Sequence, residues 1–210
     1  MRTNLQQYTE TTSTDDFVLQ NSKLLKVRLS EGEIQAKRGS MVAYQGEVSF
    51  EHAGSGGLGR MIKKAATGEV FLADTAQEIH LLYLEGETIT VNGPSLLAFD
   101  SDIDWDITMM AGGAAGMMAG GLFNTSLTGT GYVAVLSDGP PVMLDVGSAP
   151  TFADAQAAIT WSAGVTASLK TEMSAKALIG RSSGESIQMA FNGEGWLLVQ
   201  PSEGRPVMPA

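Results

Sequence analysis

The chain has 210 residues, of which 43% are hydrophobic and 17% are charged, so it can bury a sizeable core and is not expected to be disordered. Its 23 acidic and 13 basic residues give a formal net charge of −10, which would repel nucleic acid on average. It contains no cysteine, which excludes disulfides, thiolate nucleophiles, and zinc–sulfur and iron–sulfur sites.

Residues 1–16 are polar and are predicted to form a flexible N-terminal segment. This segment lacks the basic start and the apolar core of a secretory signal peptide, so export by that route is not indicated. A cysteine-free chain suits a reducing compartment, and we therefore expect a cytoplasmic protein, either free or held at the periphery of a membrane. Residues 17–200 are predicted to form a single all-β domain, followed by a C-terminal tail at residues 201–210.

Short runs of alternating apolar residues follow along the chain, at residues 25–29, 79–84, 89–91 and 132–136. Turn residues such as Asn92-Gly93-Pro94 separate these runs. Closely spaced short strands of this kind predict an all-β fold, either a β-sandwich, a barrel or a shortened double-stranded β-helix. Only two short helices are expected, at residues 60–66 and 170–178.

An internal repeat is the most informative feature of the sequence. Residues 127–135 (LTGTGYVAV) return as residues 191–199 (FNGEGWLLV), and a weaker copy lies at residues 66–72. A second apolar element recurs at residues 41–44, 96–99 and 158–161. The repeat predicts three tandem β-units, at about residues 17–107, 108–165 and 166–200, which share strands because one such unit cannot bury enough apolar surface alone.

The ordered glycine motifs at residues 68–73, 120–123, 127–135 and 184–200 resemble the mitochondrial biogenesis family, also called "altered inheritance of mitochondria". The resemblance spans roughly residues 17–200. It implies a fold similar to the trp RNA-binding attenuation protein, tripled within one chain, with three chains forming a ring. The family has no accepted active site, so the resemblance assigns no functional residue.

Two classes of function remain open at this point. The repeat, the low charge content and the resemblance favour a non-catalytic structural or scaffold protein that forms a homotrimeric β-ring and contacts a membrane or a membrane complex. The alternative is a small-ligand or RNA-binding module, which the net charge of −10 opposes. We expect no enzyme and no cofactor, because no catalytic motif, thiol or histidine cluster is present.

A row of acidic residues is the weak metal-site candidate. In an extended strand, side chains two residues apart point to one face, so four carboxylates would line up. Such a row could bind calcium, but Trp105 and Ala111 stand where a calcium-binding loop needs glycine and glutamate. We expect an exposed acidic strand face instead, formed by Asp100, Asp102, Asp104 and Asp106.

An uncharged segment rich in methionine and glycine follows this row. No charged residue occurs between Ile107 and Ser137. The segment is predicted to form a hairpin or loop that is buried at a subunit interface, or that contacts a membrane or a partner, since methionine suits irregular contacts. The candidate contact residues are Met109, Met110, Met117, Met118, Leu122 and Phe123.

Three other patterns favour ordinary structural roles. Residues 54–59 read G-x-G-x-x-G, but no alternating strand–helix series follows, so a flexible turn is expected rather than a dinucleotide site. The histidines, His52 and His80, do not have metal-ligand spacing. The basic residues Lys23, Lys26 and Arg28, and Arg60, Lys63 and Lys64, are expected to be solvated surface.

Overall fold

The computed structural model describes residues 4–29, 32–52, 60–109, 123–169 and 188–203. These residues form fifteen strands and two 3-10 helices, Leu5–Tyr8 and Gly93–Ser95, and contain no α-helix. The prediction of an all-β fold is therefore confirmed. The helix expected at residues 60–66 is wrong, because this stretch pairs with strands on both sides and that pairing overrides a weak local preference. Residues 170–178 lie outside the described residues.

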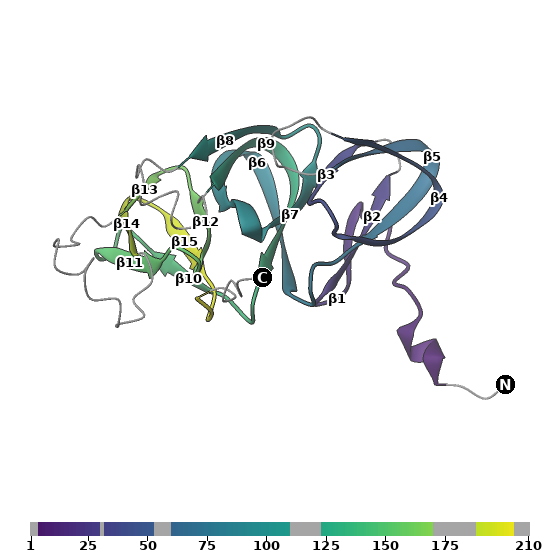
Figure 1. The fold of residues 1–210 in the computed structure, drawn as a ribbon, viewed down its shortest axis with the longest axis horizontal. Helices are drawn as coiled ribbons and strands as arrows, with labels where there is room; N and C mark the ends of the chain where they lie inside the picture. Colours follow the sequence, from purple (N-terminus) through teal and green to yellow (C-terminus); the bar gives the residue numbers. More distant parts are fainter. Residues whose placement is uncertain (1–3, 30–31, 53–59, 110–122, 170–187, 204–210) are drawn as a thin grey trace, which may run out of the picture.

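The strands form three consecutive groups that lie side by side along the molecule (Figure 1). The first unit comprises β1 (Phe17–Asn21), β2 (Leu24–Leu29), β3 (Ile34–Ala36), β4 (Met41–His52) and β5 (Arg60–Leu72). The second comprises β6 (Glu78–Asn92), β7 (Leu96–Asp100), β8 (Asp104–Met109) and β9 (Phe123–Ser137). The third comprises β10 (Val142–Asp145), β11 (Thr151–Asp154), β12 (Ala158–Ser162), β13 (Val165–Leu169), β14 (Gln188–Gly193) and β15 (Trp196–Val199).

One twelve-stranded sheet passes through all three units. Its order is β1-β2-β5-β3-β7-β9-β6-β12-β15-β10, with β4 paired to β5 and β8 paired to β9. A second sheet in the third unit has the order β11-β14-β13. The units are thus joined by backbone hydrogen bonds between strands, and the boundaries expected from sequence at residues 107 and 165 fall inside β8 and β13.

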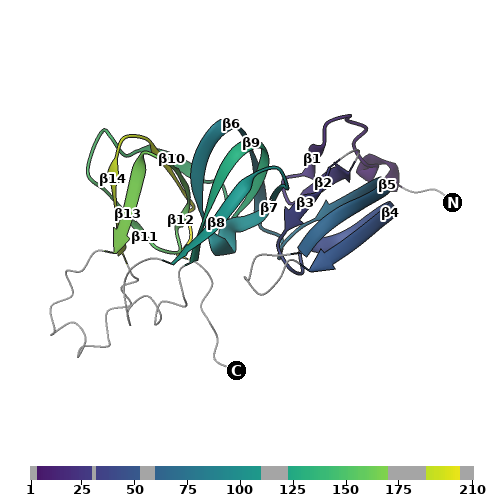
Figure 2. The same cartoon turned by 90° about the horizontal axis from the view of Figure 1, so that it is seen from above.

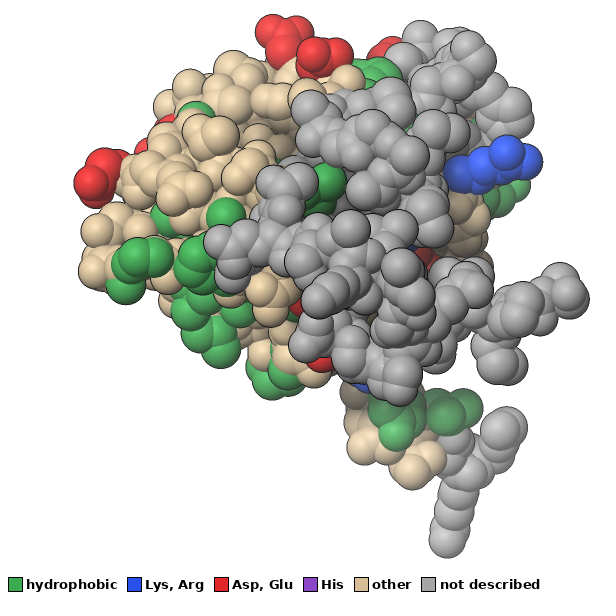
Figure 3. All heavy atoms as spheres, turned by 60° about the vertical axis from the view of Figure 1, so that its left-hand side comes forward, with side chains coloured by type: hydrophobic (Ala, Val, Ile, Leu, Met, Phe, Trp, Pro, Cys, Tyr) green, Lys and Arg blue, Asp and Glu red, His purple; other side chains and the backbone are tan. Residues whose placement is uncertain are grey.

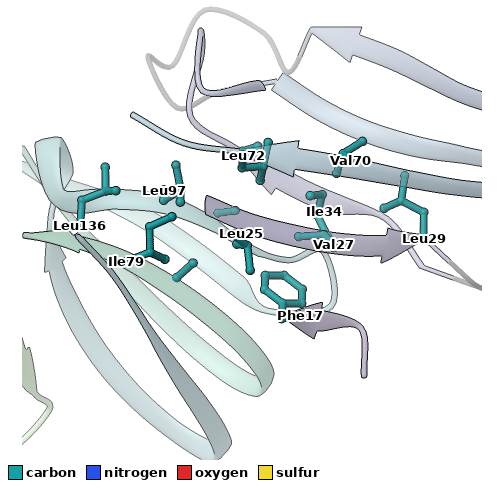
Figure 4. Close-up of a cluster of buried hydrophobic side chains, with 13 residues drawn as sticks. Phe17, Leu25, Val27, Leu29, Ile34, Val70, Leu72, Ile79, Leu97 and Leu136 are labelled. Carbon is teal, nitrogen blue, oxygen red and sulfur yellow. The ribbon is translucent and has the colours of Figure 1, made fainter. Parts of the chain in front are cut away.

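Each unit has a hydrophobic cluster, and neighbouring clusters are shared across the unit boundaries. In β2 the alternate residues Leu25, Val27 and Leu29 are buried, as the period of two in a strand requires. Figure 4 shows these side chains within the first cluster. That cluster also includes residues of the second unit, namely Ile79, Leu97, Ala98, Ala134 and Leu136. The burial of apolar area across this boundary holds the first two units together, because each Å² removed from water contributes about 25 cal/mol to stability.

The strand registers show that the three units are structurally equivalent. In each unit, an apolar element pairs with the C-terminal end of the strand that carries or follows the glycine motif, which is β5, β9 or β15, and each pairing contains a bulge at the same place. These apolar elements are residues 41–44, 96–99 and 158–161. The bulges lie between Met41↔Leu72 and Ala43↔Phe71, between Leu96↔Val135 and Ala98↔Ala134, and between Ala158↔Val199 and Thr160↔Leu198. On this alignment Gly68 corresponds to Gly131 and Gly195, the second glycine of the repeated motif.

Candidate interaction surface

The four aspartates predicted to share one strand face are divided by a turn. Asp100 ends β7 and Asp104 begins β8, and a hydrogen bond from the Ile103 N–H to the Asp100 carbonyl closes the turn between them. The Asp100 carboxylate points inward and accepts a hydrogen bond from the Tyr132 N–H at 2.6 Å. The prediction of a single acidic face is therefore wrong, because side-chain alternation does not continue through a turn. The three aspartates that remain exposed are Asp102, Asp104 and Asp106.

The structure gives no support for a metal centre in this row. Among the residues that the structure describes, no three acidic or histidine side chains are grouped so that they could hold a metal ion. Burial raises the pKa of the Asp100 carboxyl, although the hydrogen bond from Tyr132 acts in the opposite direction. Burial also lowers the pKa of His80, whose Nε2 lies 2.7 Å from the Ser137 hydroxyl oxygen, while Glu78 partly opposes this effect.

Other candidates from the sequence have structural roles or lie outside the described residues. Lys26 was expected on a solvated surface but is only 4% exposed, and its ammonium contacts Glu69 and the Thr11 carbonyl. The G-x-G-x-x-G string, residues 54–59, lies outside the residues that the structure describes. It is followed by β5 rather than by a helix, so the helix N-terminus that a dinucleotide site requires is not present there.

The predicted contact residues lie at or beyond the end of the β8–β9 ladder. Met109 and Phe123 are paired at that end, and Phe123 is exposed. Met110, Met117, Met118 and Leu122 lie outside the described residues. Within the described part of the chain, no helix has the length and apolar character to span a membrane. The predicted contact of this segment with a subunit or a membrane stays a prediction.

A polar cleft of about 310 Å³ lies where the linkers between strands meet. Lys37 and Asp74 form an ion pair of 2.7 Å in it. The Gln200 side chain accepts a hydrogen bond from the Asp138 N–H and donates one to the Gln156 carbonyl. These polar groups bond to one another, which favours a structural role for the cleft in holding the units together.

Two internal junctions between units have the same geometry. In the first junction, β3 of the first unit pairs with β7 of the second. In the second, the last residues of β6 pair in the same way with β12 of the third unit. The matching register pairs are Ile34↔Asp100, Gln35↔Phe99 and Ala36↔Ala98 in the first junction, and Ile89↔Ser162, Thr90↔Trp161 and Val91↔Thr160 in the second.

The strands that correspond to these junction strands in the two outer units are paired on one side only, as far as the described residues show. By its pairing with β14, β11 corresponds to β3, and by its bulged pairing with β5, β4 corresponds to β7 and β12. Within the described residues, β11 pairs only with β14 and β4 pairs only with β5. The chain therefore ends in two complementary halves of a third junction.

Exposed aromatic side chains mark both of these strand edges. Phe152 in β11 is 50% exposed, and Tyr44 in β4 is 52% exposed. Tyr44 corresponds to Phe99 and Trp161, which are buried in the hydrophobic clusters of the second and third units, and Phe152 corresponds to Gln35, which is also buried. Figure 3 shows hydrophobic side chains on the face of the molecule seen from the side of the third unit. Sequence reasoning missed these two edges as a site.

The fold defines an all-β protein of three tandem, equivalent units. Comparison with family models matches residues 17–202 to the family described as mitochondrial biogenesis AIM24, and the chain belongs to this family. The resemblance seen in the glycine motifs is thereby confirmed. The crystal structure of protein SPYM3_0169 from Streptococcus pyogenes is similar over 89% of this chain and 92% of that chain, with 21% identity and a TM-score of 0.74, which shows a shared fold. No curated protein matches the chain.

Proposed function

We propose that the protein is a non-catalytic structural scaffold whose chains join edge to edge into a homotrimeric β-ring. One observation carries the proposal. The chain makes the same strand junction twice internally and then exposes, at its two ends, the two halves of a third. Pairing β11 of one chain with β4 of the next would place Thr151, Phe152 and Ala153 opposite Gln45, Tyr44 and Ala43, in the register of the internal junctions.

The physical argument concerns unpaired strand edges. An exposed edge offers a row of backbone N–H and C=O groups to any other strand, so proteins usually cover or charge such edges. Here the exposed edges carry aromatic residues instead of lysine or proline. A head-to-tail contact that uses two different surfaces closes into a ring when the rotation allows, and closure would leave neither β4 nor β11 with an open edge. The number of three chains is taken from the family resemblance.

The assembled scaffold would present the hairpin ends of its units to a membrane or a membrane-bound complex. In Figure 2, β4, β8 and β13 run toward the same side of the molecule. The paired residues at these ends are His52↔Arg60, Met109↔Phe123 and Leu169↔Met189. Between Met109 and Phe123 the sequence has no charged residue and is rich in methionine, alanine and glycine. Such composition favours apolar contacts over solvent.

The assembly is tested by native mass spectrometry and by size-exclusion chromatography with light scattering. We expect a trimer of the wild-type chain at micromolar concentration. Lysine on either edge, as Phe152→Lys or Tyr44→Lys, should shift the population to monomer, because it places a charge against the incoming strand. Met143→Lys is the matched control, since Met143 is exposed on β10, outside both junction edges, and should leave the trimer intact. A wild-type monomer would overturn the proposal.

The membrane contact is tested separately by co-sedimentation with vesicles of neutral phospholipid, with and without anionic lipid. We expect the wild-type protein to sediment with vesicles, and the double variant Met117→Asp and Met118→Asp to stay in solution while remaining trimeric. Equal recovery of both proteins in the supernatant would remove the membrane role and leave the assembly in place. Leu5→Asp, an exposed apolar position in the N-terminal segment, serves as the control for added charge.

A further inference from the structure

At the C-terminal end of β3 and of β6, one side chain forms hydrogen bonds with the neighbouring unit. Lys37 directly follows β3, and its ammonium donates a hydrogen bond of 2.7 Å to the Pro94 carbonyl of the second unit. Asn92 takes the corresponding position at the end of β6, and its amide donates to two carbonyls of the third unit at 3.0 Å. In both internal junctions, a side-chain donor at the same aligned position therefore forms a hydrogen bond between the two units.

The third unit has an acceptor at this position instead of a donor. Asp154 ends β11, as Asn92 ends β6. One carboxylate oxygen of Asp154 accepts a hydrogen bond from the Gln156 N–H at 2.6 Å. The other oxygen is buried and has no hydrogen-bond partner among the described residues. Asn92 in the second junction likewise has one buried side-chain oxygen without a hydrogen-bond partner among the described residues, so the two residues share this feature as well as their position.

A cation stands at the matching position on the other end of the chain. The bulges align Met41, Leu96 and Ala158, so Arg38 corresponds to Ala155, whose carbonyl accepts from Asn92, and stands next to Gly39, which corresponds to the acceptor Pro94 of the first junction. Arg38 is exposed, and no ion pair with it occurs among the described residues. The internal junctions have no charged residue at this receiving position. The two outer ends of the chain thus carry opposite charges where a third junction would bring them together.

We propose that Asp154 of one chain forms a salt bridge with Arg38 of the next chain, beside the contact of Phe152 with Tyr44. This inference rests on the proposed edge-to-edge assembly. The salt bridge would select the head-to-tail direction of the contact and the register of the paired strands. A head-to-tail contact brings the carboxylate to the guanidinium, whereas a contact between two β4 edges would offer Arg38 no Asp154 carboxylate. Charge complementarity of this kind selects one arrangement mainly by penalising the others. A guanidinium presents several N–H donors in a planar array, which suits it to a carboxylate such as that of Asp154.

A charge exchange tests the pair on the full-length chain. We expect Arg38→Asp and Asp154→Arg each to weaken association at least about tenfold, measured as the dissociation constant of the oligomer by sedimentation equilibrium. The double variant should recover affinity to within about threefold of wild type, because the charges are exchanged but still opposite. Asp102→Arg, on an exposed turn of the second unit, is the control and should not change association. Far-UV circular dichroism verifies that each variant is folded.

The possible outcomes distinguish failure of the salt-bridge proposal from failure of the assembly proposal. If the wild-type chain is trimeric and neither single variant changes its dissociation constant, the salt bridge is overturned and the edge-to-edge scaffold stands. A double variant as weak as the single ones also overturns the direct pair. Arg38 is exposed, so the Arg38→Asp result remains interpretable even if Asp154→Arg perturbs the fold. A monomeric wild-type chain overturns both proposals.

Discussion

The Asp100 carboxylate accepts a hydrogen bond from the backbone N–H of Tyr132, across the pairing of β7 with β9. Ser162 has the same relationship to Trp196 in the third unit, where its hydroxyl accepts the N–H at 3.1 Å. A Cβ added to Gly131 would lie 2.7 Å from an Asp100 carboxylate oxygen, and one added to Gly195 would collide with the Ser162 hydroxyl. The second glycine of the motif therefore makes room for the side chain that satisfies the next N–H.

We expect removal of this acceptor to destabilise the fold. Asp100→Ala leaves the Tyr132 N–H without its partner, which should lower the free energy of unfolding by about 1–3 kcal/mol. Asp100→Asn keeps an acceptor and removes the charge. Because burial raises the folded pKa of Asp100, ionisation weakens the fold as pH rises through that pKa, so the Asn variant should equal or exceed wild type at pH 7. Urea unfolding measures all three proteins.

Alanine at the second motif glycine should be among the most damaging small changes. Gly131 has φ +149° and Gly195 has φ +142°, a region that other residues rarely adopt, and each packs against an acceptor side chain. Gly131→Ala and Gly195→Ala should each lower the free energy of unfolding by about 2 kcal/mol or more. Gly32→Ala is the control, because a Cβ there meets no atom within 4 Å. Equal thermal midpoints for all three variants would contradict this role.

The glycine-punctuated apolar strands of the repeat made the all-β fold predictable, but the unit boundaries expected at residues 107 and 165 fall inside β8 and β13. The acidic row was not predictable in the same way. Ser101 and Asp102 form a turn, and only the pairing of Asp104 with Thr128 on β9 shows that the chain has begun a new strand. Turn-forming residues between two apolar runs were the signal in the sequence, but the alternation of aspartates concealed it.

The exposed edges could not be identified from sequence, although their aromatic residues belong to the repeated element. Tyr44, Phe99 and Trp161 look alike in sequence, since each follows an apolar run at the same repeat position. Their burial differs because Phe99 and Trp161 pack into the hydrophobic clusters of the second and third units, whereas Tyr44 is 52% exposed on β4, which pairs only with β5 among the described residues. Burial of a strand position depends on which distant strand pairs with it, which local pattern does not determine.

Removing either member of the ion pair between the buried Lys26 and Glu69 should change the free energy of unfolding by different amounts. The Lys26 ammonium lies 3.4 Å from Glu69 and donates a hydrogen bond of 3.1 Å to the Thr11 carbonyl. Glu69→Gln leaves a buried cation with weaker compensation and should lower the free energy of unfolding by about 2 kcal/mol. Lys26→Met removes the cation together with its desolvation cost and should stay within about 1 kcal/mol of wild type. Urea titrations at low and high salt measure both. A larger loss for Lys26→Met than for Glu69→Gln would contradict this account.

His80 should make stability depend on pH on the acidic side of neutrality. The Ser137 hydroxyl donates its hydrogen to the Gly139 carbonyl at 2.7 Å, so Nε2 of the His80 imidazole carries a hydrogen and donates it to the Ser137 oxygen. Burial lowers the folded pKa of His80, with Glu78 partly opposing, so the unfolded chain takes up the proton first as pH falls.

The stability that the neutral imidazole contributes is therefore complete above pH 6.5, the ordinary histidine value, and is lost as pH falls from there through the lower folded pKa. His80→Gln keeps a hydrogen-bond donor for Ser137 but cannot titrate. Carboxylates change their ionisation in both proteins, so the informative quantity is the difference in unfolding free energy between wild type and His80→Gln at each pH. This difference should shift against wild type between pH 7.5 and pH 5. A difference that is constant with pH would show that burial does not hold His80 neutral in the folded chain.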